Sequence, residues 1–154
     1  MNLLCISSVI VLFCLQQADL FCINILSEDE KPCARPLNLD ADSVLDFYQT
    51  NSQSPVFAEY LNCIWLARNF VNKDGTISYE NIKASKSLPW EISHFCEDVI
   101  TLTRKAQQEY KQAAIYCENN PPAAATPLTV RQCIVDNYKP IPIEDYLKTN
   151  PYLD

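Results

Sequence analysis

Hydrophobic residues recur at helical spacing through the middle of the chain. In residues 56–71 the inward positions are Phe57, Tyr60, Leu61, Ile64, Ala67 and Val71. Steps of three and four residues are typical of an amphipathic helix. Similar patterns predict further helices over residues 40–48, 78–85, 91–103, 104–117 and 129–135. The sequence therefore predicts an all-α protein, a compact bundle of about six helices.

Capping and helix-breaking residues mark the ends of these segments. Asp40 to Ser43 supply caps for the first helix, and Ser54-Pro55 opens the second. Residues 72–75 (NKDG) read as a turn or a C-terminal cap. We expect residues 88–90 (LPW) to break the chain before the 91–103 helix, and residues 120–122 (NPP) to stop the 104–117 helix.

A continuous apolar run from Leu3 to Leu15 opens the chain. It is shorter than the roughly 20 residues that span a bilayer, so we expect a secretory signal peptide over residues 1–18 and no membrane insertion. Cleavage after Ala18 leaves six cysteines, whereas the competing cleavage after Cys22 leaves five. An even number suits an oxidising compartment, and this favours Ala18. The expected location is extracellular.

The last part of the chain is rich in proline. Residues 121–154 hold six of the ten prolines. We expect one short helix around Cys133 and an otherwise extended tail that packs on the helical domain of residues 19–120. A disordered terminus is the alternative.

Composition excludes several classes of partner. A net charge of −7 argues against nucleic acid and anionic membrane surfaces. Gly75 is the only glycine, which argues against a glycine-rich loop that binds phosphate. With 48% apolar and 20% charged residues, the chain is expected to be globular.

The ionisable residues do not suggest catalysis. His94 is the only histidine, so a catalytic triad or a histidine-based metal site has little to draw on. We expect it to be partly exposed at a helix start, with a pH-sensitive latch as the alternative. Residues 28–30 (EDE) read as a solvated acidic face. A calcium loop with Gly75 at its sixth position would need carboxylates where Phe70 and Asn81 stand. We expect neither an enzyme, a cofactor nor a metal site.

The cysteine spacing resembles a known family. Cys33, Cys63, Cys96 and Cys117, with EYLNC at residues 59–63 and NKDGTISYEN at residues 72–81, are similar to insect odorant-binding proteins over residues 33–118. The family's second and fifth cysteines would fall on Glu59 and Gln108, as in its four-cysteine ("minus-C") subgroup. The chain departs from the pattern in a short gap of 32 residues between Cys63 and Cys96, and in the extra Cys22 and Cys133.

The resemblance implies disulfides Cys33–Cys63 and Cys96–Cys117, and parity then leaves Cys22 with Cys133. Cys96 and Cys117 lie on consecutive predicted helices, which suits a bridge between antiparallel neighbours. The residues alone still allow fifteen pairings of six cysteines.

The resemblance also implies an internal apolar cavity within the helices. Its expected lining residues are Phe57, Tyr60, Ile64, Trp65, Phe70, Trp90 and Tyr110. Ordinary core packing is the alternative for each of them. The expected function is that of a secreted carrier of a small hydrophobic ligand, such as an odorant or pheromone. The alternative is a secreted protein-interaction factor of saliva or reproductive fluid, with a receptor or another secreted protein as partner.

Overall fold

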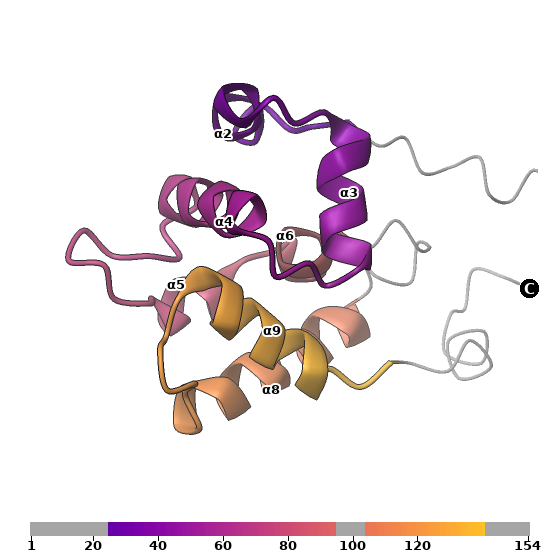
Figure 1. Ribbon diagram of the computed structural model, residues 1–154. Helices are drawn as coiled ribbons and strands as arrows, with labels where there is room; N and C mark the ends of the chain where they lie inside the picture. The colour runs from indigo at the N-terminus through magenta and orange to yellow at the C-terminus, as the bar shows by residue number, and fades with distance from the viewer. Residues whose placement is uncertain (1–24, 95–103, 141–154) are drawn as a thin grey trace, which may run out of the picture.

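The computed structural model describes residues 25–94 and 104–140. The expected signal peptide, Cys22, Cys96 and the last part of the expected tail lie outside these residues. Within them the chain forms helices α2 (Lys31–Ala34), α3 (Ala41–Gln49), α4 (Pro55–Ala67), α5 (Tyr79–Ala84), α6 (Leu88–Ser93), α8 (Arg104–Asn119) and α9 (Pro127–Asn137), with a 3-10 helix η2 at Arg35–Leu37 (Figure 1). The described part contains no strand beyond an isolated bridge between Val71 and Ile77. The predicted all-α class is confirmed.

Short polar side chains begin α3 and α4 where the sequence predicted. Asp40 accepts a hydrogen bond from the backbone N–H of Ser43 and caps α3. Ser54 accepts from the backbone N–H of Phe57 and caps α4, with Pro55 in the first turn. Each cap satisfies a backbone N–H that has no partner inside the helix.

The α4 helix ends four residues earlier than predicted. It stops at Ala67 because Asn69 adopts a left-handed conformation with φ of 58°, which asparagine tolerates better than most residues. Residues 71–77 then form the predicted turn, in which Asn72 N–H donates to the carbonyl of Thr76. Gly75 has φ of 84° there, where a side chain would be strained.

Pro89 begins a helix instead of breaking one. The α6 helix runs from Leu88 to Ser93 with this proline in its first turn, where the missing N–H costs no hydrogen bond. The helix ends because His94 has φ of 48°. The predicted break at residues 88–90 is therefore wrong, because a helix begins there. The helix predicted over residues 91–103 is also wrong in its start, since α6 begins at Leu88 and ends at Ser93. Residues 95–103 lie outside the described chain.

The α9 helix belongs to the hydrophobic core. It is longer than the helix predicted over residues 129–135, because Thr126 and Thr129 form a capping box before it. Val130 and Ile134 are fully buried, and α9 packs against α8, α4 and α6. Residues 127–137 are thus part of the helical domain, and the buried side chains of α9 hold the chain that follows α8 against the core.

Two disulfides in the described part of the chain link pairs of helices. Cys33–Cys63 joins α2 to α4, as predicted, with the two Cα atoms 5.6 Å apart. Cys117 bonds to Cys133 and joins α8 to α9, with the Cα atoms 6.1 Å apart. This corrects the expected pairs Cys96–Cys117 and Cys22–Cys133. The short connector between α8 and α9 brings Cys133 beside Cys117, and the sequence pattern did not predict this hairpin.

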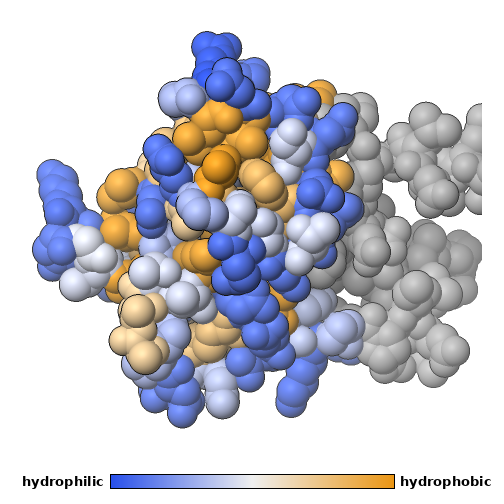
Figure 2. Space-filling model, viewed as in Figure 1, coloured by the Kyte–Doolittle hydropathy of each residue, from blue (hydrophilic) through white to orange (hydrophobic). Residues whose placement is uncertain are grey.

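On the face shown in Figure 2, hydrophobic side chains reach the surface in patches separated by hydrophilic ones. The largest exposed apolar side chains of the described residues are Ile25, Val56, Leu66 and Tyr116. No helix in this part of the chain has the length and apolar character needed to cross a bilayer.

Candidate functional site

Glu30 places a carboxylate wholly inside the molecule. It ends the turn that leads into α2, and Ser27 donates to its Oε2 from the backbone N–H (2.8 Å) and from Oγ (2.7 Å). The hydroxyl of Tyr60 on α4 donates to Oε1 over 3.1 Å. The exposed fraction of Glu30 is zero. Residues 28–30 are therefore not a uniformly solvated face, because the buried carboxylate requires these donors.

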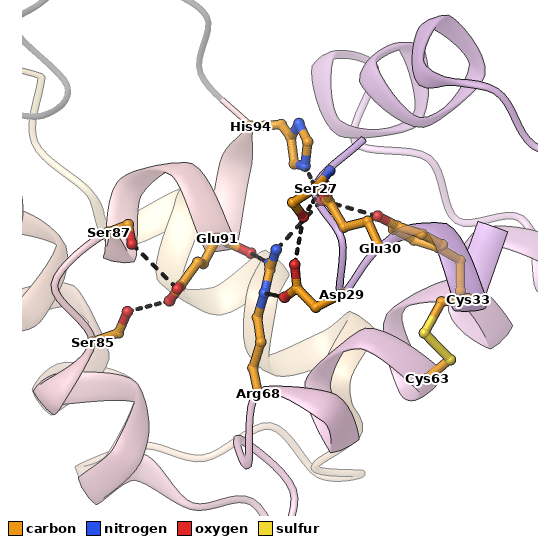
Figure 3. Close-up of polar contacts among 11 residues, drawn as sticks. Ser27, Asp29, Glu30, Cys33, Cys63, Arg68, Ser85, Ser87, Glu91 and His94 are labelled. Carbon is orange, nitrogen blue, oxygen red and sulfur yellow. Dashed lines mark hydrogen bonds and ion pairs between the residues drawn. A yellow bond between two sulfur atoms is a disulfide. The ribbon is translucent and has the colours of Figure 1, made fainter. Parts of the chain in front are cut away.

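His94 completes the surroundings of that carboxylate. Its Nε2 lies 2.5 Å from Glu30 Oε1, and its ring is buried (Figure 3). The left-handed backbone that ends α6 turns this ring inward. The expectation of a partly exposed histidine at a helix start is wrong, and a protonated His94 forms a buried ion pair with Glu30.

Opposing influences set the pKa of Glu30. Burial alone would raise it, but the hydrogen bond and charge of His94 and the bonds from Ser27 outweigh burial and lower the pKa to about 2. Glu30 is therefore ionised at neutral pH. The Glu30–His94 pair ties the start of α2 to the end of α6.

Arg68 provides a second cation beside this pair. Its Nε donates to Asp29 Oδ2 (2.9 Å), and its Nη2 lies 3.5 Å from Glu30 Oε1. Its Nη1 donates to the carbonyl of Glu91 on α6 over 3.4 Å. Figure 3 shows the arginine extending between Asp29 and Glu91. The charge of Arg68 is thus matched mainly by Asp29.

Aromatic rings surround Tyr48 of α3. The ring of Tyr48 stacks on His94 with centroids 4.4 Å apart and meets Phe57 edge-on at 5.1 Å. Trp90 lies on His94, also at 4.4 Å. We name the group the Tyr48 cluster; its members are Phe47, Tyr48, Phe57, Tyr60, Trp90 and His94. Helices α3, α4 and α6 each contribute to it, so it forms only when the chain is folded.

Arg131 of α9 also contacts this cluster. Its Nε donates to the carbonyl of Ile92 (2.9 Å) and its Nη2 to the carbonyl of Tyr48 (3.0 Å). The guanidinium carbon lies 5.1 Å from the centre of the Tyr48 ring and 5.5 Å from that of Phe57, within the range of cation–π interactions. Arg131 is only 1% exposed. Burial lowers its pKa.

Three buried polar atoms at this place lack hydrogen bonds. They are the Tyr48 hydroxyl, His94 Nδ1 and Arg131 Nη1, none of which has a partner among the described residues. An unsatisfied buried polar atom costs about 1–3 kcal/mol. Their concentration around one ring is uncommon in a protein interior, and it makes the Tyr48 cluster the candidate binding site.

The structure brings together some of the residues predicted to line a cavity. Phe57, Tyr60 and Trp90 belong to the Tyr48 cluster. Ile64 is buried in the hydrophobic core, one helical turn after Tyr60 on α4. Trp65 and Phe70 form a separate pair with centroids 5.7 Å apart.

Tyr110 lies near the end of α6. Its hydroxyl donates to the buried Ser93 over 2.7 Å, and its ring stacks on Tyr138 at 4.1 Å. Tyr110 therefore contacts the segment that carries His94 and does not belong to the Tyr48 cluster.

Two grooves open at the surface, and neither encloses the Tyr48 cluster. The larger, about 620 Å³, is bordered by residues 68–73, Asn81, residues 84–85 and Glu91. The smaller, about 400 Å³, lies between Leu66, the 71–75 turn and residues 125–127. Phe70 is the one predicted lining residue that borders either of them. The expected internal cavity is not one of these two grooves.

Sequence reasoning missed Glu30 and Arg131. Glu30 follows two other acidic residues, so the sequence predicted that its side chain is exposed to solvent. No local pattern indicates that it is buried. Arg131 carried a weak signal, because it stands three residues before the apolar Ile134 and so shares a helical face with it.

Metal binding and family membership receive no support from these residues. In the described ranges, no group of three or more His, Cys, Asp or Glu side chains is arranged to hold a metal ion. Comparison of the chain with family models, with curated proteins and with solved structures yields no match.

Proposed function

We propose that this protein is a secreted, non-enzymatic carrier that binds a small hydrophobic ligand beside the Tyr48 cluster. The observation that carries the proposal is a set of aromatic rings whose neighbouring polar atoms are buried without partners. Such sites for small molecules are mostly apolar, with a few polar groups that orient the ligand. Removing about 200 Å² of apolar ligand surface from water would contribute roughly 5 kcal/mol before the costs of association.

The disulfides support export, because such bonds persist in oxidising compartments. Their pattern gives less support to the resemblance with odorant-binding proteins. Cys33–Cys63 agrees with that family, whereas Cys117–Cys133 replaces the Cys96–Cys117 bond that the resemblance implies. The proposal therefore depends on the aromatic site rather than on the cysteine pattern.

A pair of matched variants tests the position of the ligand. Phe57 lies in the Tyr48 cluster, whereas Phe70 packs on Trp65, and the two rings are 0% and 2% exposed. Phe57→Leu and Phe70→Leu remove similar buried area, so both destabilise the fold to a similar extent. The assay titrates the mature protein with an apolar naphthylamine dye and follows the dye fluorescence. Small lipophilic compounds are then added to displace the dye, and their affinities are calculated.

We expect Phe57→Leu to weaken dye binding by roughly tenfold, equivalent to about 1.4 kcal/mol, and Phe70→Leu to weaken it much less. A larger loss of dye affinity in Phe70→Leu than in Phe57→Leu would instead place the ligand in the groove bordered by Phe70. If no dye and no lipophilic compound binds, the carrier proposal fails, and the protein-interaction alternative becomes the one to test.

A further inference from the structure

We propose that the ligand of this carrier bears a carboxylate, and that Arg131 binds this head group together with the hydroxyl of Tyr48. The inference rests on the proposed function and adds the chemical class of the ligand: an amphipathic carboxylate, such as a fatty acid, rather than a neutral lipophile.

The first argument is the balance of charge around the Tyr48 cluster. Glu30 is paired with His94, and Arg68 is paired with Asp29. Arg131 has no carboxylate within 4 Å among the described residues. Every ion pair of these residues involves other side chains. Asp136, five residues along α9, is exposed and accepts from Gln132. Among the residues that the structure describes, the interior thus contains a cation without a matching anion.

The second argument is the geometry of the donors. The guanidinium uses Nε and Nη2 on backbone carbonyls and leaves Nη1 without a partner. The hydroxyl of Tyr48 is also unpaired, and Arg131 lies against the same tyrosine ring. A carboxylate accepts several hydrogen bonds and pairs well with a guanidinium, and such charge-assisted bonds are about twice as strong as neutral ones. One anionic head group would therefore satisfy donors that the protein leaves unused.

The third argument is access, since Arg131 is closed off in this structure. The α3 helix, which carries Tyr48, contains no cysteine, whereas α2 is bonded to α4 and α8 to α9. A transient outward movement of α3 would lift the Tyr48 ring from His94 and from the guanidinium and admit the ligand, and the return of α3 would bring the Tyr48 hydroxyl back to the head group beside Arg131. Phe57 on α4 would then border the opened space and meet the apolar chain of the ligand.

The test compares dodecanoate with dodecanol, which have the same chain length and differ in the charge of the head group. Each is titrated against the naphthylamine dye bound to the mature protein at neutral pH, and displacement of the dye gives its affinity. We expect dodecanoate to bind at least tenfold more tightly than dodecanol, as a charge-assisted hydrogen bond predicts. Arg131→Gln should bring the two affinities within about twofold, whereas Arg35→Gln, a change at an exposed arginine, should keep the wild-type preference.

Equal affinities in the wild type overturn the inference and leave the carrier function intact, whereas absence of all binding contradicts the carrier function itself. A preference that persists in folded Arg131→Gln also overturns the assignment. If that variant does not fold by circular dichroism, Tyr48→Phe replaces it, because it removes only an unpaired hydroxyl. We expect Tyr48→Phe to lower the preference several-fold, and a full preference in this variant overturns the inference.

Discussion

Replacing Glu30 by glutamine tests the buried pair with His94 most directly. The change keeps the size and shape of the side chain and removes its charge. The pKa of Glu30 falls from its ordinary 4.5 to about 2 in the folded protein, which corresponds to roughly 3 kcal/mol of stabilisation of the ionised form. We expect Glu30→Gln to lower the free energy of unfolding by about that amount at neutral pH.

The sign of the pH dependence follows from the lowered pKa. The unfolded chain takes up the proton first, near pH 4.5, while the folded protein still holds Glu30 ionised. The stabilisation is therefore fully present above about pH 4.5 and is lost as the pH falls towards about 2. The groups that face this carboxylate are His94, Arg68, Tyr60 and Ser27.

Urea unfolding followed by circular dichroism at a series of pH values measures this difference. We expect the curves of wild type and Glu30→Gln to converge as the pH approaches 2. Glu28→Gln is the matched control, because the Glu28 side chain on the same turn is 91% exposed, and it should follow the wild-type profile. A constant gap between Glu30→Gln and wild type from neutral to acid pH would refute the reasoning.

Three further predictions concern the fold. Replacing Cys117 and Cys133 together by serine should cost about 3 kcal/mol for their separation of 16 residues; a non-reducing peptide map checks the bond, and a peptide joining Cys117 to another cysteine would contradict it. Ile134→Ala should cost about 2–5 kcal/mol in chemical unfolding, because the side chain is fully buried, whereas Leu66→Ala, at a side chain 53% exposed, should cost much less. Ser54→Ala removes the cap of α4 and should cost about 1 kcal/mol; no loss of stability would contradict the role of that cap.

The starts of α3 and α4 could be predicted from the sequence because each depends on adjacent residues. Asp40 and Ser54 cap the helices that the apolar spacing predicted, since the bond from a cap side chain spans only three residues. The end of a helix was harder to predict. Asn69 and His94 take left-handed conformations that stop α4 and α6, and no capping residue or helix breaker in the sequence marked either position.

The candidate site depends on contacts between distant residues, which local patterns cannot reveal. Glu30 and His94 lie 64 positions apart, and Arg131 donates to the carbonyl of Tyr48 across 83 positions. The Cys117–Cys133 bond was also missed, because the extent of α9 was underestimated and its start near Pro127 places Cys133 beside α8. Helical spacing predicted that Phe57 and Tyr60 face the interior. It could not predict which residues of other helices they contact.

The Cys33–Cys63 disulfide encloses the whole of α3 in a covalent ring of the chain. Cleavage by a protease at one peptide bond within residues 38–54 would therefore release no fragment. Such a nicked molecule would migrate as one species until a reductant separated its two pieces. Because Tyr48 lies inside this ring, the helix that carries it would remain attached to the protein after such a cleavage.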